Sequence, residues 1–180
     1  MRRLTPDSRI RTLVMEIIEL SGINTPPVPV ETIARNLNAE LRYLPYEGEL
    51  SGMIFRENDR TVIGVNSLHH QNRQRFTIAH EIGHMKLHAD TPLFVDKQFK
   101  MERADRKQGD DWIPEEIEAN RFASELLVPT EFLRLDLDQI SVDVGDDEQI
   151  EKLAKRYKVS VPMMTFRIKK YLEKDIFEKA

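Results

Sequence analysis

Residues 75–84 read RFTIAHEIGH and contain the pattern H-E-x-x-H. In a helix, His80 and His84 lie one turn apart on the same face, so both imidazoles can reach a single metal ion. Glu81 falls on the flank of that face. Its carboxylate cannot easily join the coordination plane, but it can take a proton from a water that the metal activates. The stretch therefore predicts a metal site on one side of a helix.

The opposite side of this helix is expected to face the core. Ile78, Ile82 and Met85 recur at i, i+4 and i+7, which places them roughly opposite the histidines at ~100° per residue. Gly83 adds a small residue beside His80, and no helix breaker interrupts the segment. The alternative is a surface helix that carries two histidines and a glutamate by chance, and the register of the apolar residues disfavours it.

The composition is that of an ordinary globular protein, and it limits the ligands open to a metal. The 180 residues are 40% apolar and 32% charged, and this length favours one domain. A formal net charge of -4 gives no global reason to expect a polyanion partner. The chain has no cysteine, which excludes disulfides, thiolate metal sites and a cysteine nucleophile. Zinc (Zn²⁺) would therefore be held by histidine and carboxylate.

Nothing in the sequence predicts a membrane association. The N-terminus carries Arg2 and Arg3 but no continuous apolar region of the signal-peptide type. No segment is long and apolar enough to cross a bilayer. A cytoplasmic location without a membrane partner is therefore the expectation.

The segment before the H-E-x-x-H helix, called the metal helix below, is expected to form two short helices and a small antiparallel sheet. Apolar periodicity, turn residues and alternation place the helices at 6–21 and 30–37 and the strands at 41–44, 52–55 and 61–66. An edge strand of such a sheet can pair with an extended substrate backbone. A sheet that only covers the core is the alternative.

A second long helix is expected between Pro114 and Pro129, after a highly charged stretch at 96–111. Proline and acidic residues suit the first turn, and the second proline marks the end. Ala119 and Ala123 lie on its apolar stripe, where small side chains allow a neighbouring helix to approach closely. The charged stretch is expected to be a solvated helix, an exposed loop or a flap over the site. The predicted fold class is α+β.

A catalytic zinc usually takes three protein ligands, so a third ligand must come from outside the first helix. Asp90 would fit the extended H-E-x-x-H-x-x-G-x-x-H/D arrangement, but that arrangement needs a glycine where this chain has Leu87. We therefore expect a glutamate on the second helix. Of Glu115, Glu118 and Glu125, which lie near one row, Glu118 is favoured because it is central.

Three further histidines are open to several interpretations. His69 and His70 are adjacent, point in different directions and are expected to be surface or capping residues. His88 follows His84 by four residues. It is either a group that supports a metal ligand or faces the substrate, or part of a fraying helix end. A group that stabilises the oxyanion is expected among five residues that the sequence does not rank: Tyr43, Tyr46, His88, Arg121 and Tyr157.

The C-terminal part, 148–174, has the pattern of a helix-turn-helix hairpin. Its basic residues are Lys152, Lys155, Arg156, Lys158, Arg167, Lys169 and Lys170. DNA binding is one interpretation. A helical hairpin that closes the core is the other, and it is favoured because Pro162 and two methionines stand where polar residues that contact bases would be expected.

The segments RFTIAHEIGH (75–84), Leu87-His88 and EANRFASELLVP (118–129) resemble the ImmA/IrrE family of bacterial metallopeptidases. The resemblance extends over most of the chain and implies a gluzincin-like fold. It implies His80, His84 and Glu118 as zinc ligands and Glu81 as the catalytic base. Val128 stands where methionine is frequent in the family, and no chemistry depends on that change.

The resemblance also implies a function. The family is associated with cleavage of helix-turn-helix repressors, which releases genes of mobile elements or stress responses. Residues 1–180 are expected to form one zinc metallopeptidase domain, without the DNA-binding domain that many relatives carry before it. The expected activity is hydrolysis of a peptide bond in such a repressor. The competing hypothesis is a regulator that binds DNA or a repressor, with a structural or vestigial metal site.

Overall fold

The computed structural model describes residues 6–48, 50–57, 60–88, 93–96, 114–139 and 146–179. The chain packs into two compact units. One unit is Val30–Ala123, and the other combines Met1–Pro29 with Ser124–Ala180. The division falls within one helix, α4 (Pro114–Leu127). Each unit is described separately below, and the expectation of a single peptidase domain stays a prediction.

The unit that contains the H-E-x-x-H stretch is α+β, which confirms the predicted fold class. Besides the first ten residues of α4, it holds six elements: α2 (Val30–Asn36), β1 (Ala39–Leu44), β2 (Gly52–Glu57), β3 (Arg60–Asn66), α3 (Gln71–Leu87) and β4 (Leu93–Asp96). The predicted positions of α2 and of the first three strands are confirmed to within a few residues. Of the charged stretch 96–111, only Asp96 lies within the described residues.

The sheet of this unit is mixed rather than purely antiparallel. Its strand order is β1-β3-β2-β4. The pairs β2–β3 and β2–β4 are antiparallel, whereas β1 runs parallel to β3 with Ala39 opposite Thr61. The difference arises because β2 and β3 form a hairpin, and its second strand, not its first, pairs with β1. That choice of partner is a long-range contact that local alternation does not reveal.

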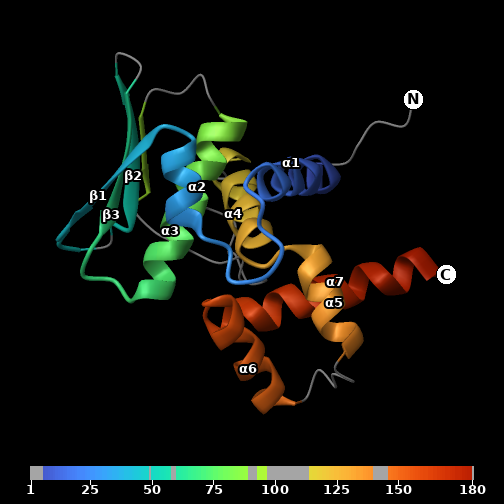
Figure 1. The fold of residues 1–180 in the computed structure, drawn as a ribbon. Helices are drawn as coiled ribbons and strands as arrows, with labels where there is room; N and C mark the ends of the chain where they lie inside the picture. The colour runs from blue at the N-terminus through green and yellow to red at the C-terminus, as the bar shows by residue number, and fades with distance from the viewer. Residues whose placement is uncertain are drawn as a thin grey trace, which may run out of the picture. The chain divides into compact units, whose positions relative to one another are not determined.

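One face of the sheet is covered by α2 and α3 (Figure 1). Ile54, Ile63 and Val65 point to this face and are fully buried. At Gly52 the approach is very close, because an added Cβ would collide with the methyl group of Thr77 on α3. The start of β2 therefore lies directly against the helix that carries the histidines.

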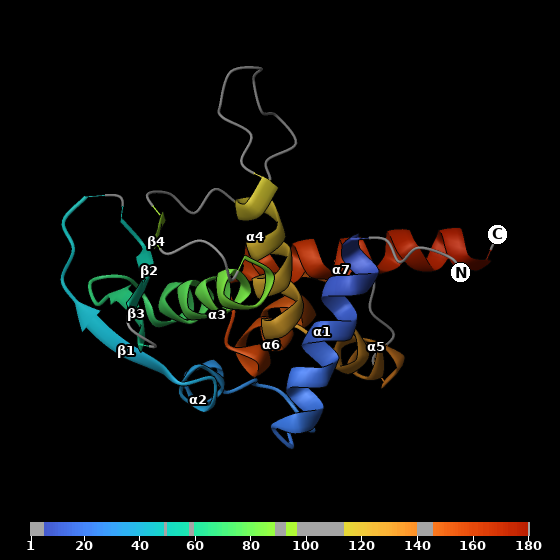
Figure 2. The same ribbon diagram turned by 90° about the horizontal axis from the view of Figure 1, so that it is seen from above.

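The second unit is helical. It contains α1 (Pro6–Leu20), α5 (Thr130–Gln139), α6 (Asp147–Tyr157), α7 (Val161–Lys179) and the last turn of α4. Arg11 of α1 pairs with Glu131 of α5, and Asp7 pairs with Lys170 of α7 at 3.3 Å, so α1 lies beside both helices (Figure 2). The core residues include Val14, Ile18, Leu133, Leu153, Tyr157, Met164 and Ile168.

The C-terminal hairpin predicted at 148–174 is present as α6 and α7. Lys158 ends α6 in the left-handed conformation, with φ of 54°, and its backbone N–H donates to the last carbonyls of the helix. Met163 and Met164 are buried. The hairpin therefore contributes core residues to its unit. Among the described residues, no helix combines the length and the apolarity that crossing a bilayer requires.

A buried ion pair fixes the start of α5 against α7. Arg167 donates to Glu125 Oε2 at 2.7 Å, to the carbonyl of Val128 at 2.7 Å and to Thr130 Oγ1 at 3.1 Å. Both charged side chains are almost fully buried. Burial alone would raise the pKa of Glu125, but Arg167 and the hydrogen bonds from Thr130 lower it, so the carboxylate is ionised.

Candidate metal centre

The start of α3 is fixed by polar groups at the turn that precedes it. Asn66, buried at the end of β3, donates to the carbonyls of Tyr46 and Leu50 at 2.9 and 2.8 Å and accepts from the backbone N–H of Leu68 at 3.0 Å. His70 caps the helix, because its Nδ1 accepts from the backbone N–H of Asn72. The prediction of a capping role is thus confirmed for His70.

The H-E-x-x-H pattern lies in the buried half of α3. His80, Glu81 and His84 are at most 1% exposed. Two imidazole nitrogens, His80 Nε2 and His84 Nε2, lie 3.0 Å apart. The predicted convergence of both rings on one point is therefore present in the structure.

The carboxylate that completes this group belongs to Glu116, in the first turn of α4. Glu116 Oε2 lies 3.3 Å from His80 Nε2, and Glu116 Oε1 lies 3.3 Å from His84 Nε2. His80, His84 and Glu116 form a group that could hold a metal ion. Two imidazoles and one carboxylate are a donor set that catalytic zinc uses in proteins.

The spacing of the three donors fits a metal ion. With bonds of about 2.0–2.1 Å, tetrahedral geometry places ligand atoms roughly 3.3 Å apart. The two Nε2 atoms are 3.0 Å apart, and each lies 3.3 Å from one of the two oxygens of the Glu116 carboxylate. His80 Nδ1 lies 2.9 Å from Asn120 Oδ1, and an Nδ1–H that donates to this acceptor would leave the lone pair of Nε2 free to bind a metal. The three side chains could therefore hold one cation.

Burial and the neighbouring charges favour the ligand forms of these side chains. Burial lowers the pKa of His84, against a smaller opposing effect of the Glu116 hydrogen bond, so the imidazole tends to be neutral. Burial alone would raise the pKa of Glu116, but the hydrogen bonds and charges of His80 and His84 outweigh it and lower the pKa. The centre therefore carries an ionised carboxylate that can offset part of the charge of a divalent ion.

Glu118, the expected third ligand, is not part of this group. Its Oε2 lies 3.7 Å from His88 Nε2, and its side chain is 43% exposed. Glu116 and Glu118 are two positions apart, so they project about 200° apart around the helix axis. Glu116 shares a face with Ala119, Asn120 and Ala123, at spacings of three, four and seven residues. This is the face that approaches α3, and the structure accordingly places Glu116 beside the two histidines.

Close contact between α3 and α4 depends on Gly83. A Cβ added at Gly83 would lie 3.1 Å from the Cα of Ala119 and 3.2 Å from Cδ1 of Phe122. The two helices therefore touch at the turn between the histidines, and this contact brings Glu116 within reach. The small residues noted in the sequence on both helices have this role.

Glu81 lies against the sheet. Its side chain is fully buried, and its Oε1 lies 3.5 Å from the position of a Cβ on Gly52. Arg56, further along β2, contributes an electrostatic attraction with Glu81. Glu81 is thus on the side of α3 that faces β2, next in sequence to His80.

The comparisons with known proteins agree with this geometry. The profile of the IrrE N-terminal-like domain family, Peptidase_M78, matches residues 34–169. The chain belongs to this family. Membership confirms the resemblance to ImmA/IrrE metallopeptidases and supports a metallopeptidase-like role.

Solved structures related to this Peptidase_M78 member include a Mycobacterium tuberculosis transcriptional regulator. The two chains are 17% identical with a TM-score of 0.53, and the alignment covers 88% of this chain and 45% of that one. This similarity shows a shared fold. Among curated proteins, none matches the chain.

The structure distinguishes among the expected oxyanion-stabilising residues of this family member. The Tyr46 hydroxyl packs on Gly64 beside Met53, on the sheet face opposite α3. Tyr157 donates a hydrogen bond to Asp136 at 2.8 Å. The ring of His88, by contrast, lies next to that of His84, with centroids 5.4 Å apart. His88 thus lies beside a histidine of the group that could hold a metal.

Proposed function

We propose that this chain is a zinc-dependent metallo-endopeptidase that hydrolyses a peptide bond in a protein substrate. The observation that supports it is the convergence of three side chains. His80 Nε2 and His84 Nε2 lie 3.0 Å apart, each lies 3.3 Å from a different oxygen of the Glu116 carboxylate, and the buried Glu81 is next in sequence to His80. His80, His84 and Glu116 would hold the metal, and Glu81 would be the catalytic base.

The roles of the residues follow from their positions. Bound zinc supplies a Lewis acid that lowers the pKa of a water and polarises a carbonyl. Glu81 accepts the proton of the attacking water and passes it to the leaving amine. Asn120 holds the ring of His80 in the tautomer whose Nε2 is a donor to metal. The fully buried positions of His84 and Glu81 keep bulk water away from both groups.

The sheet offers an edge strand with which the backbone of a protein substrate could pair. In the described part of the sheet, β4 is the edge strand next to β2, and β2 follows α3 from Thr77, which contacts Gly52, to His84, which contacts Arg56. An extended segment added to this edge would pair with β4 and continue the sheet that packs on α3, as in β-strand addition. Because the family is associated with them, we propose a helix-turn-helix repressor as the substrate, cleaved to release mobile-element or stress-response genes in the cytoplasm.

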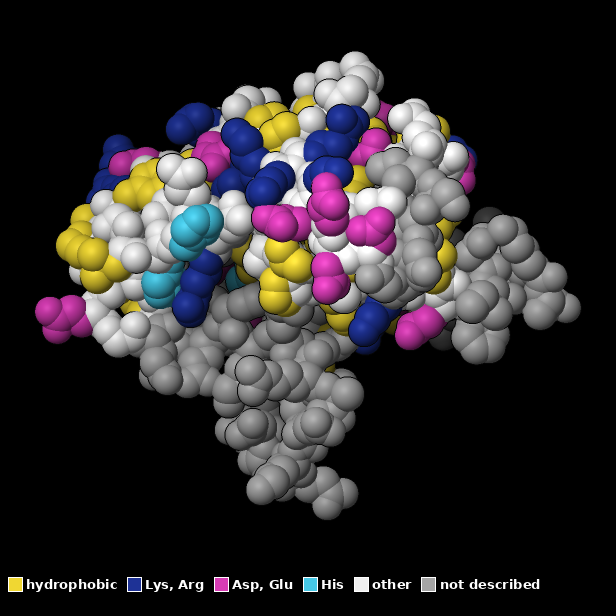
Figure 3. Space-filling view, turned by 90° about the horizontal axis from the view of Figure 1, so that it is seen from below, with side chains coloured by type: hydrophobic (Ala, Val, Ile, Leu, Met, Phe, Trp, Pro, Cys, Tyr) yellow, Lys and Arg dark blue, Asp and Glu magenta, His cyan; other side chains and the backbone are white. Residues whose placement is uncertain are grey.

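The competing function, a regulator that binds DNA through α6 and α7, has less support. Its basic residues are largely engaged with acidic ones: Lys152 with Glu148, Lys155 with Glu151, Arg156 with Asp136, Arg167 with Glu125, and Lys170 with Asp7. On the face shown in Figure 3, Lys and Arg side chains likewise lie beside Asp and Glu side chains. Phosphate contacts need basic groups that are not already compensated.

The test compares the protein with Glu81→Gln. Both proteins are purified, analysed for metal, and incubated with repressor proteins encoded beside the gene, with and without a chelator, and cleavage is followed by mass. We expect about one zinc per chain in both, and cleavage by the unsubstituted protein alone. Full cleavage by Glu81→Gln, or cleavage that survives the chelator, would contradict the proposal.

The same preparations discriminate against the regulator. Binding to random duplex DNA is measured at several salt concentrations, because phosphate contacts make the affinity fall steeply with salt. A peptidase should bind such DNA weakly at physiological salt. Tight binding without any proteolysis would favour the regulator.

A further inference from the structure

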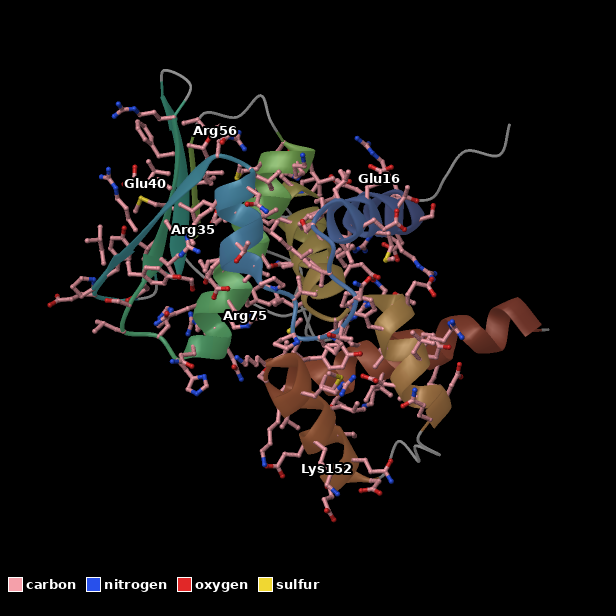
Figure 4. All side chains as sticks on the ribbon, in the orientation of Figure 1. Glu16, Arg35, Glu40, Arg56, Arg75 and Lys152 are labelled. Carbon is pink, nitrogen blue, oxygen red and sulfur yellow. The ribbon has the colours of Figure 1, made fainter. Side chains whose placement is uncertain are left out.

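One arginine of the sheet contacts the end of the metal helix. Arg56 of β2 donates from Nη1 to the carbonyl of His88 at 3.1 Å and from Nη2 to the carbonyl of His84 at 3.0 Å. Figure 4 shows Arg56 beside the C-terminal end of α3. The two carbonyls belong to a proposed metal ligand and to the histidine whose ring lies next to it.

The carbonyl of His88 needs a partner from outside the helix, and that of His84 has room for a second donor. The last four carbonyls of an α-helix lack an intrahelical donor, and a cation near them is favoured by the helix dipole. The carbonyl of His84 already accepts from the backbone N–H of His88, the C-cap, at 3.0 Å. Arg56 is the additional donor, and its planar fork can reach two carbonyls at once.

The contact lies at one end of a longer attachment between β2 and α3. At the other end, Gly52 packs against Thr77 and Glu81. Between these two points β2 runs along α3, which also packs on β3. The helix leaves its regular conformation at His88, with φ of -130° and ψ of 53°, and Arg56 donates to carbonyls on both sides of this last turn.

We propose that Arg56 is a positioning residue of the metal centre, which fixes the last turn of α3 so that His84 points at the metal and His88 lies beside it. The inference rests on the proposed function in that it takes His84 as a ligand. Arg56 acts through backbone carbonyls and does not touch the metal. Its effect should therefore appear in metal affinity and in the geometry of the bound ion.

The charges around Arg56 are consistent with this role. Burial lowers the pKa of the guanidinium and the charge of Glu81 raises it. An arginine stays protonated under such conditions. The side chain therefore keeps its donors and its charge next to both the helix end and the proposed base.

The experiment measures Co²⁺ binding to the full chain by competition with a chelator, together with the visible absorption of the bound ion. The variants are Arg56→Ala, Arg56→Lys and Arg73→Ala. Arg73 is the matched control, because it also ties α3 to the region of β2, donating to Ser51 Oγ at 2.8 Å, but at the helix end remote from the histidines. Circular dichroism checks that each variant is folded.

Loss of a group that orients a metal ligand typically costs 10–100-fold in affinity. We expect Arg56→Ala to raise the dissociation constant for Co²⁺ at least tenfold and to change the absorption spectrum. Arg56→Lys, which retains a charge but not the fork, should lie between it and the unsubstituted protein. Arg73→Ala should leave the absorption spectrum unchanged and the dissociation constant for Co²⁺ within about threefold of the original. That change is smaller than the 10–100-fold expected when a ligand is misplaced.

Two results would overturn the inference. One is that Arg56→Lys and Arg56→Ala, when folded, bind Co²⁺ as tightly as the unsubstituted protein and with the same spectrum. The other is that Arg73→Ala weakens binding as much as Arg56→Ala, which would reduce the effect to general stability of α3. If Arg56→Ala does not fold, the comparison of Arg56→Lys with Arg73→Ala decides. Failure of the unsubstituted protein to bind Co²⁺ would instead refute the proposed function.

Discussion

Two glutamates of α4 that are two positions apart should differ sharply in their importance for metal binding. Glu116 Oε2 lies 3.3 Å from His80 Nε2, and Glu116 Oε1 lies 3.3 Å from His84 Nε2. Glu118 instead lies 3.7 Å from His88 and has an exposed side chain. Because alanine at either position changes helix propensity equally, Glu116→Ala and Glu118→Ala form a matched pair.

The magnitude follows from the number of ligands. A structural zinc held by four ligands is bound with about 10–16 kcal/mol, which is roughly 2.5–4 kcal/mol per ligand. Since 1.4 kcal/mol corresponds to a factor of ten, loss of the Glu116 carboxylate should weaken zinc binding by about 60–700-fold. Loss of Glu118 removes one half-exposed ion pair with His88 and should weaken binding by less than about threefold, as exposed pairs contribute little.

The assay is competition for zinc with a chromophoric chelator at neutral pH, on the two variants and the unsubstituted protein. Thermal unfolding of the metal-free proteins controls for loss of structure. A Glu118→Ala variant that loses zinc while Glu116→Ala retains it would refute the geometric reasoning. Equal, small effects in both would show that the two histidines hold the ion with a donor from elsewhere.

Two further predictions concern the helical unit. Arg167→Ala should lower the free energy of unfolding by about 3–5 kcal/mol, because it leaves the buried Glu125 carboxylate without its cation. The control is Lys152→Ala, at an exposed ion pair, which should leave the free energy of unfolding nearly unchanged. Urea unfolding measures both. Because the pKa of Glu125 is lowered in the folded protein, its ionised form contributes stability above the unfolded pKa of about 4.3 that is lost as the pH falls through the folded pKa. Glu125→Gln should therefore flatten the loss of stability below about pH 4 in urea titrations at several pH values, and an unchanged slope would contradict this.

The sequence was most informative where a pattern is local. The spacing of His80 and His84 in RFTIAHEIGH predicted their convergence, and the apolar period of 6–21 predicted α1. The pairing of β1 with β3 was beyond such reasoning, because strand order depends on contacts between segments far apart in the chain. Helix α5 was not predicted, although Pro129-Thr130 and the apolar Phe132 and Leu133 give a start signal and an inward face.

Local periodicity came close to predicting Glu116 as the third member of the group that could hold a metal. The stripe through Ala119 and Ala123 was correctly identified as the close-packing face of α4. Extending that stripe one turn toward the N-terminus reaches Glu116, whereas the row through Glu118 lies on a different face, about 200° away around the helix axis. Asn120 and Arg56 carry no comparable signal, since each acts through a contact with an element elsewhere in the chain.

Gly83 shows a trade-off between the stability of a helix and the chemistry that it supports. A glycine inside a helix costs about 1 kcal/mol relative to alanine, so α3 is intrinsically weaker at this residue than it needs to be. In exchange, the axis of α4 comes close enough for a carboxylate to reach the two imidazoles. Substitutions selected only for thermostability would favour alanine here, and they would widen the gap between the donors although no donor is altered. A residue that sets the distance between two helices can therefore be as necessary to the proposed metal site as the ligands themselves.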